Sequence, residues 1–200
     1  MIQLDAYKML QTADGELPLD ISLTIKKGEF VSVYGNSGAG KTTILRILAG
    51  LTRAEKSVIK VGESVWDDSI KKIHFPVQNR SIGFVFQDFA LFPNLTVKEN
   101  LEFALSKNDS KEIIPELIEL MELQSLQNSK PQNLSGGQKQ KIGLARSIIR
   151  QPQILLLDEY TNALDNESQK IISDEIYNRH RTIIFVTHKN IMKILITGAD

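Results

Sequence analysis

Residues 35–42 read Gly35-Asn36-Ser37-Gly38-Ala39-Gly40-Lys41-Thr42, and this stretch decides the fold. Its three glycines let the backbone turn tightly and point successive N–H groups at one place, as a loop that holds phosphate groups must do. The lysine supplies a positive charge for the β- and γ-phosphates, and the threonine hydroxyl is a ligand for Mg²⁺. The pattern therefore predicts a site for a nucleoside triphosphate, with a chance glycine-rich turn as the alternative.

The segments on either side of this loop favour the phosphate site. Residues 30–34 (FVSVY) predict a strand that enters the loop, and residues 42–51 predict a helix with one apolar face. The helix would point its positive end at the bound phosphates. A phosphate loop requires this strand–loop–helix context, so the chance reading is weak.

Two further segments predict central strands of a parallel sheet. Residues 154–157 (ILLL) and 183–186 (IIFV) are continuous apolar runs, which suit strands buried on both faces, and residues 82–86 predict another strand. Polar pairs follow the two runs, Asp158-Glu159 and Thr187-His188. Ligands bind at the carboxyl ends of parallel strands, so these four residues lie beside the phosphate loop if the strands share one sheet.

The acidic pair suits hydrolysis of the nucleotide. Asp158 is placed to hold Mg²⁺, directly or through water, and Glu159 to orient or deprotonate the attacking water. The alternative is an acidic pair that only starts a loop. The phosphate loop upstream favours the catalytic reading.

The middle of the chain, residues 95–150, lacks strand patterns and predicts a helical lobe. Thr96 and Glu99 form a plausible capping box before a helix through Leu105. Pro115 lies in the first turn of the next helix or breaks it, and residues 128–133 predict a polar loop.

Residues 134–138, LSGGQ, predict a helix start that contains two glycines, which lower the stability of a helix. In the simple interpretation Ser135 is the N-cap and Gln138 closes a capping box. Each of the two glycines, however, lowers helix stability by about 1 kcal/mol relative to alanine. A helix start with bare amides is also an anion site, so we interpret the stretch as a second phosphate-binding element.

The composition is that of a folded protein without excess charge. Of the 200 residues, 42% are hydrophobic and 24% are charged, which allows one domain with a sizeable core. Lys plus Arg and Asp plus Glu both number 24, a balance that argues against non-specific binding to nucleic acid. The lack of cysteine excludes disulfides and thiolate metal sites. Residues 1–10 lack a secretory pattern and no apolar run approaches the roughly 20 residues of a membrane span, so we expect a cytoplasmic protein.

Together these motifs resemble the nucleotide-binding subunits of ABC transporters. Residues 35–42 are similar to the Walker A loop, residues 134–138 to the signature, and residues 154–158 to Walker B. Gln87 resembles the Q-loop glutamine, residues 162–165 (NALD) the D-loop, and His188 the switch histidine. His74 and His180 have no such context and are expected to lie on the surface.

The resemblance covers residues 28–188 and implies an α/β fold, the RecA-like P-loop NTPase. In that fold a mostly parallel sheet is flanked by helices, with an inserted α-helical subdomain and a small antiparallel β region. The whole chain would be one ABC ATPase domain, with residues 1–88 and 151–200 as the nucleotide-binding core and residues 89–150 as the helical signature subdomain.

The resemblance also implies an ATPase that uses ATP and Mg²⁺. It assigns catalysis to Glu159, His188 and Gln87, and metal binding to Thr42, Gln87 and Asp158. The residues that it implies for ATP binding are Gly35, Asn36, Ser37, Gly38, Ala39, Gly40, Lys41, Thr42, Thr43, Ser135, Gly136, Gly137, Gln138 and Asp165. Two subunits of this family pair head to tail, so Ser135 and Gly137 would face the γ-phosphate held by Lys41 of a second copy.

Residues 86–100 (FQDFALFPNLTVKEN) resemble the importer branch of the family. Phe89, Leu91 and Phe92 would line a groove for a coupling helix of a membrane permease, with core packing as the alternative. The resemblance is closest to molybdate, sulfate and related oxyanion importers. It implies a homodimer on the inner face of the cell membrane, with permease subunits and a solute-binding protein as partners and without nucleic acid.

Several positions depart from the family pattern. Tyr160 stands where the family usually has proline, and no aromatic stands near residues 10–12, where one usually stacks on adenine; Tyr7 or Leu10 would replace it. After His188 the sequence ends early, so we expect either a minimal protein or a truncated product. These departures keep two alternatives open, a non-transport ABC ATPase acting on DNA or ribosomes and a nucleotide-binding regulator with little turnover.

Overall fold

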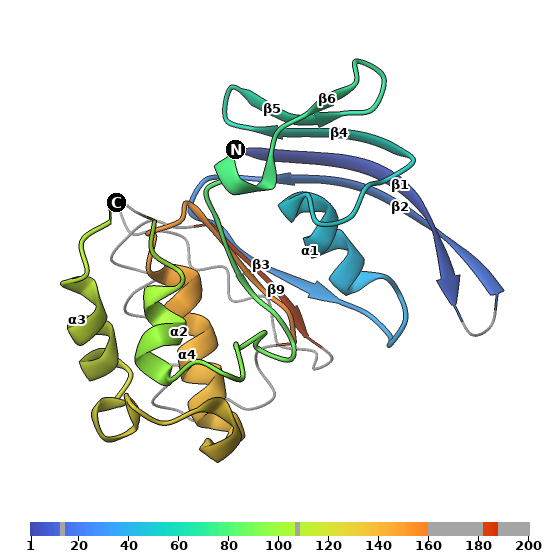
Figure 1. Cartoon of the computed structure of the whole chain (residues 1–200). Coiled ribbons are helices and arrows are strands. Elements are labelled where there is room, and N and C mark those ends of the chain that lie inside the picture. Colours follow the sequence, from blue (N-terminus) through green and yellow to red (C-terminus); the bar gives the residue numbers. More distant parts are fainter. Residues whose placement is uncertain (13–14, 107–108, 160–181, 188–200) are drawn as a thin grey trace. The chain divides into compact units, whose positions relative to one another are not determined.

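An antiparallel sheet of five strands, in the order β2-β1-β4-β5-β6, forms from the first 74 residues (Figure 1). Its strands are β1 (Ile2–Thr12), β2 (Gly15–Ile25), β4 (Lys56–Val61), β5 (Ser64–Asp68) and β6 (Ile73–His74). Along β1, Ile2, Leu4 and Ala6 are buried while the residues between them are not, the period of two expected of a sheet with one covered face. This is the small antiparallel region implied by the resemblance, although the sequence did not locate its strands.

The terminal strand of this sheet is β2, which pairs with β1 along its whole length, from Ile2↔Ile25 to Thr12↔Gly15. In this register Met9 lies opposite Pro18. The N–H of Met9 donates to Glu55 Oε2, on the side of β1 that faces β4. The pair Met9–Pro18 is therefore not joined by ladder hydrogen bonds, and the backbone nitrogen of Pro18 points away from β1.

The predicted strand before the phosphate loop is confirmed as β3 (Phe30–Tyr34). It pairs in parallel with β9 (Thr182–Thr187), the strand predicted at residues 183–186, and the rings of Phe30 and Phe185 lie 4.7 Å apart. The predicted helix follows as α1 (Lys41–Ala49), and it ends at Gly50, whose φ of 79° is left-handed.

A second parallel pair consists of β7 (Ile82–Val85) and β8 (Ile154–Leu157), as predicted. All four residues of β8 are buried, in agreement with an apolar run covered on both faces. Three α-helices lie between these strands in sequence, namely α2 (Val97–Glu102), α3 (Ile113–Leu120) and α4 (Gly136–Ile148). Short 3₁₀ turns occur at η1 (Val77–Asn79), η2 (Gln124–Leu126) and η3 (Pro131–Asn133).

Both predicted capping boxes are confirmed. Thr96 and Glu99 exchange side chain–backbone hydrogen bonds at the start of α2, and Ser135 and Gln138 do so at the start of α4. Pro115 lies in the first turn of α3. The prediction of a helix through Leu105 was too long, because the N–H groups of Ala104 and Leu105 bond three residues back and tighten the chain after Glu102.

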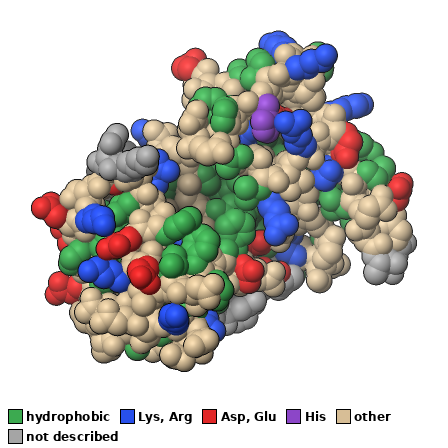
Figure 2. All heavy atoms as spheres, in the orientation of Figure 1, with side chains coloured by type: hydrophobic (Ala, Val, Ile, Leu, Met, Phe, Trp, Pro, Cys, Tyr) green, Lys and Arg blue, Asp and Glu red, His purple; other side chains and the backbone are tan. Residues whose placement is uncertain are grey.

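The computed structural model describes residues 1–12, 15–106, 109–159 and 182–187. They form two compact units, one with residues 1–81 and β9, the other with residues 82–159. The proposed division into core and helical subdomain stays a prediction. Within the described parts, no helix is long and apolar enough to cross a membrane. Basic and acidic side chains are interspersed over the face drawn in Figure 2.

Candidate functional site

The phosphate loop connects β3 to α1 in a preformed shape. Gly38 and Gly40 have φ angles of 78° and 86°, values that side chains disfavour. Lys41 is only 6% exposed, and its Nζ donates to the carbonyl oxygens of Gly35 at 2.9 Å and Asn36 at 2.7 Å. The loop thus holds a buried ammonium with its own backbone, and a phosphate oxygen would compete for the same three donors.

The start of α1 suits an anion. The N-cap position is Gly40, which has no side chain to cap the helix, and the first turn contains no acidic residue. Thr42 and Thr43 follow in this turn and are half-buried. The positive end of the helix and the N–H groups of its first turn therefore face the loop, as phosphate binding requires.

Leu10 and Leu19 cover the loop from the β1–β2 hairpin. A Cβ on Gly40 would stand 2.7 Å from Leu10 Cδ1 and 3.1 Å from Leu19 Cδ2. Tyr7 lies an odd number of residues from Leu10 on β1, so the two side chains point to opposite faces of the sheet. Leu10 is thus beside the loop and Tyr7 is not on that face.

In the second unit, the strand register brings Gln87 and Glu159 together. Val85 lies opposite Leu157 at the carboxyl ends of β7 and β8, and the N–H of Asp158 extends the ladder to Val85 O at 3.0 Å. Gln87 and Glu159 each follow two residues after this pair, and Gln87 Nε2 donates to Glu159 Oε2 at 2.7 Å. Asp158 is 2% exposed. The predicted catalytic pair is therefore in direct contact.

The backbone on both sides of this contact is strained. Glu159 has φ 50°, and Phe89 and Ala90, just after Gln87, have φ 61° and 43°. Residues other than glycine occupy this left-handed region at a cost of order 1 kcal/mol or more, and such strain clusters at functional sites. Surrounding contacts must hold these three residues in place.

Helix α4 supplies some of the contacts that hold Phe89 and Ala90 in place. Arg146 Nη1 donates to Ala90 O at 2.6 Å, and its guanidinium lies 5.0 Å from the ring centre of Phe92. A Cβ on Gly143 would stand 3.3 Å from Phe89 Cβ, so the glycine lets the segment approach the helix. Burial lowers the pKa of Arg146. The segment after Gln87 is thus fastened to the helix that begins at the signature.

Asn100 of α2 fastens the other end of the same segment. It is fully buried, its Oδ1 accepts the N–H of Phe92, and its Nδ2 donates to the carbonyls of Phe92, Leu95 and Thr96. The sequence did not identify Asn100 or Arg146, because both act on backbone carbonyls that carry no sequence signal. The one signal in the sequence was the amide of Asn100, which stands among the apolar positions of its helix.

The glycines of the signature have no packing role within the described residues. Apart from the chain neighbours and the helix's own backbone, no described atom lies within 4 Å of a Cβ built on Gly136 or Gly137, whereas one on Gly143 would press on Phe89. The capping box engages Ser135 Oγ, which accepts the N–H of Gln138 at 3.2 Å, and Gln138 Oε1, which accepts the N–H of Ser135 at 2.9 Å. Open space above bare helix amides agrees with the prediction of an approaching ligand.

The site residues fall into separate groups. The loop residues 35–43 lie in the first unit, whereas Gln87, Asp158, Glu159 and residues 135–138 lie in the second. Tyr160, Asp165, His180 and His188 lie outside the described residues. Within the described parts no group of three or more His, Asp or Glu side chains could hold a metal ion by itself. Mg²⁺ often needs only one or two carboxylates beside substrate phosphates, and the Asp158 carboxylate of the second unit and the Thr42 hydroxyl of the first are each of a chemistry that suits it.

Comparison with known proteins places these motifs in a family. The family model described as "ABC transporter" matches residues 19–162. The spermidine/putrescine import ATP-binding protein PotA of Haemophilus influenzae is 42% identical over 179 residues, which cover 84% of this chain and 46% of that protein. PotA of Escherichia coli is 40% identical over 177 residues, covering 84% and 45%. The chain thus spans less than half the length of these relatives.

Solved structures show the same fold. A dimeric ATP-binding cassette in a post-hydrolysis state, bound to ADP and Pi, superposes with a TM-score of 0.78 at 30% identity, covering 94% of this chain and 88% of that one. A second dimeric structure of the same cassette, MJ0796, gives a TM-score of 0.77 at the same identity. The predicted fold class, an α/β P-loop NTPase, is confirmed.

Proposed function

This chain belongs to the ABC transporter family, and on that basis we propose that it is the ATP-binding and ATP-hydrolysing subunit of an importer of a small solute. The observation that carries the proposal is the phosphate loop, in which a buried Lys41 is held by the loop's own carbonyls at the uncapped start of α1. The cassettes of similar structure include one bound to ADP and Pi.

The loop residues hold the β- and γ-phosphates in this proposal. N–H groups of residues 35–43 donate to phosphate oxygens, and Lys41 exchanges its contacts with the Gly35 and Asn36 carbonyls for contacts with phosphate. Thr42, Asp158 and Gln87 would hold Mg²⁺, which would supply positive charge to the phosphates. Leu10 and Leu19 present an apolar surface beside the loop for the base.

Glu159 is the proposed general base, and Gln87 orients it. The amide donates to Oε2 at 2.7 Å and so orients the carboxylate that would accept a proton from water. His188 and Asp165 complete the site by resemblance. A second copy of the chain supplies Ser135, Gly136, Gly137 and Gln138, whose open helix start suits the γ-phosphate.

The segment after Gln87 is the proposed contact with a membrane permease. Phe103 is 62% exposed and its ring lies 4.3 Å from that of Phe92, while Phe89 and Leu91 are half-buried. A contiguous apolar patch is typical of a contact surface, and the pairing of Phe103 with Phe92 supports the proposal. This contact would place the chain on the cytoplasmic face of the membrane, with a solute-binding protein in the same system.

The solute is proposed only as small. The relatives are named for import of spermidine and putrescine, whereas the sequence resemblance favours an oxyanion. Uptake of labelled putrescine, sulfate and molybdate by cells that carry or lack the gene would distinguish a polyamine from an oxyanion. Cells that lack the gene should fail to take up only the solute that the importer transports.

ATPase activity of the purified chain tests the nucleotide chemistry. We expect Lys41→Ala to abolish ATP binding, and Glu159→Gln to keep binding, block hydrolysis and accumulate an ATP-bound dimer on a sizing column. Lys60→Ala, which removes an exposed lysine of β4, is the control and should behave as the unmodified chain. Hydrolysis at the normal rate by Glu159→Gln would refute the assignment of the base.

A further inference from the structure

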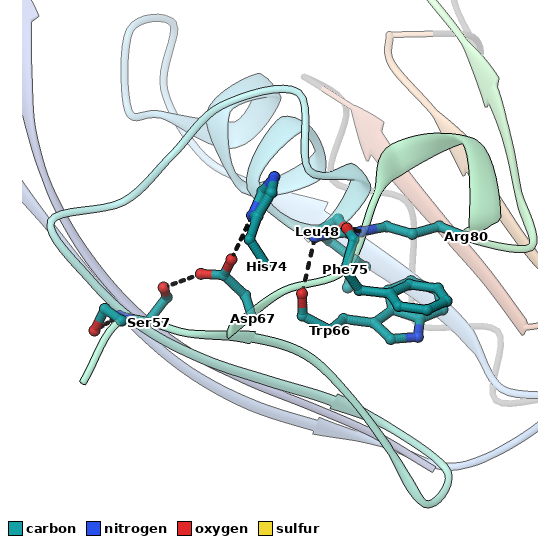
Figure 3. Close-up of polar contacts among 8 residues, drawn as sticks. Leu48, Ser57, Trp66, Asp67, His74, Phe75 and Arg80 are labelled. Carbon is teal, nitrogen blue, oxygen red and sulfur yellow. Dashed lines mark hydrogen bonds and ion pairs between the residues drawn. The ribbon is translucent and has the colours of Figure 1, made fainter. Parts of the chain in front are cut away.

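Arg80 joins three separate elements through its guanidinium (Figure 3). It is 5% exposed, and it donates from Nη1 to Leu48 O at 2.7 Å, from Nη2 to Trp66 O at 3.1 Å and from Nε to Phe75 O at 3.2 Å. These carbonyls belong to α1, to β5 and to the residue that follows β6. No motif of the sequence pointed to this arginine.

The strand β5 contains a bulge at Trp66, whose carbonyl Arg80 contacts. Ile59 lies opposite Asp67 but Lys60 lies opposite Val65, so Trp66 is an extra residue on its strand. Its carbonyl accepts the N–H of Phe75 at 2.8 Å as well as Arg80. The buried Trp66 ring stacks on Phe75 with centroids 6.3 Å apart, and the guanidinium carbon of Arg80 lies 5.3 Å from the Trp66 centroid.

The Leu48 carbonyl is one of the last of α1. The N–H groups of Gly50 and Leu51 bond to the carbonyls of Ile47 and Arg46, and Arg80 satisfies the carbonyl that follows. Carbonyls at a helix end lack partners within the helix and carry its negative end charge, so a cation there is stabilising. A Cβ on Gly50 would stand 2.6 Å from Arg80 Cζ, so the guanidinium lies against the backbone of the helix end.

A carboxylate nearby supports the buried charge. Burial lowers the pKa of Arg80, and the negative charge of Asp67 raises it. Asp67 is itself held by two side chains: Ser57 Oγ donates to Oδ2, and His74 Nδ1 lies 2.8 Å from Oδ1 (Figure 3). The exposed His74 thus lies on the surface as predicted, and together with Ser57 it fixes Asp67 on the bulged strand.

We infer that Arg80 is a positioning residue for the phosphate loop, acting through α1 on Lys41 and Thr42. This inference rests on the proposed function. Helix α1 has nine residues and is about 13 Å long, so it moves as one rod. Its start carries the phosphate-binding groups and its end is fastened by Arg80 to the bulged strand. Nucleotide binding at the loop therefore changes the surroundings of Trp66, the single tryptophan of the chain, through α1 and Arg80.

Arginine is required by this geometry. The planar guanidinium reaches three carbonyls in different directions and lies over an aromatic ring. An ammonium is a point charge that cannot span them together. Arg80→Lys should therefore retain the charge at the helix end and only part of the positioning.

The test compares four variants of the full chain, with ATP binding measured by equilibrium dialysis and hydrolysis by phosphate release. Loss of the charged hydrogen bonds in Arg80→Met should raise KM and Kd for ATP by about tenfold, with little change in kcat. Arg80→Lys should recover part of this loss, and Gly50→Ala should reproduce the loss by displacing the guanidinium from the helix side. Ser57→Ala, which alters the same network without touching α1, is the control and should keep the normal KM.

Fluorescence gives a second readout that a purely structural role would not change. ATP should alter the emission of Trp66 in the unmodified chain and in Ser57→Ala, and should not alter it in Arg80→Met. Normal KM in folded Arg80→Lys and Gly50→Ala, or an unmodified chain that binds ATP without any change in emission, would overturn the inference. Failure of the unmodified chain to bind ATP in dialysis would instead refute the proposed function.

Discussion

Gln87 Nε2 donates a 2.7 Å hydrogen bond to Glu159 Oε2, although 72 residues separate the two in sequence. The parallel register of β7 and β8 produces this contact, since each residue follows two positions after the matched pair Val85 and Leu157. Glu159 is held with a left-handed φ of 50°, so its direction depends on its contacts. The amide of Gln87 therefore helps to orient the proposed base.

Removal of that amide should affect kcat rather than ATP affinity. Gln87→Ala should lower kcat by about tenfold or more. A general base typically increases the rate by about 10²–10⁴-fold, and a misplaced base loses much of this increase. Gln87→Glu should lower it further, since two carboxylates at this distance repel each other. Steady-state kinetics with dialysis of ATP check both. Unchanged kcat in Gln87→Glu would contradict the geometry.

Alanine at two glycines of α4 should have different effects on stability. Gly137→Ala adds a methyl group where, apart from the chain neighbours and the helix's own backbone, no described atom lies within 4 Å, so it should stabilise the helix by up to about 1 kcal/mol. Gly143→Ala should stabilise less, because its Cβ would press on Phe89 at 3.3 Å. Thermal unfolding of both variants tests this order.

The same Gly137→Ala variant should lose activity while it gains stability. The added methyl group would enter the space proposed for the γ-phosphate held by a second copy, so hydrolysis should fall by at least about tenfold. An alanine variant that is both more stable and fully active would show that the glycine has no ligand to admit.

Arg146 should stabilise the strained segment at Phe89 and Ala90. Arg146→Met should cost about 1–3 kcal/mol of unfolding free energy, the usual value of a hydrogen bond from a charged donor. Arg150→Met is the matched control, because its 3.9 Å ion pair with Asp109 is exposed and should contribute little. Hydrogen exchange should show faster exchange at residues 89–92 in Arg146→Met alone.

Leu10 should make base recognition weak. An aliphatic side chain beside the loop cannot stack on a purine as an aromatic ring does, so ATP and GTP should bind within about tenfold of each other. Leu10→Tyr should tighten both nucleotides by about 1–3 kcal/mol through stacking. Competition dialysis checks this, and Tyr7→Leu, on the opposite face of β1, should leave both affinities unchanged.

Much of the fold could be predicted where local patterns are strong. The apolar runs at β8 and β9, the strand before the phosphate loop and both capping boxes depend on neighbours in sequence, and each was found. The strands β4 to β6 were not located, although short turns join them, because a bulge at Trp66 interrupts the regular period of two along β5. Arg80, Arg146 and Asn100 were not identified either, since all three bond to backbone carbonyls, which have no signature in the sequence. The sequence assigned Gln87 and Glu159 to the same site but did not predict the hydrogen bond between them.

The position of Pro18 has a consequence for how the chain behaves among its own copies. Its nitrogen points outward from β2, the terminal strand of the antiparallel sheet, and proline has no hydrogen to donate there. A strand from another molecule that docked along this exposed edge would miss a hydrogen bond in the middle of its register. A single proline thus removes one donor from this eleven-residue edge and disfavours strand addition there.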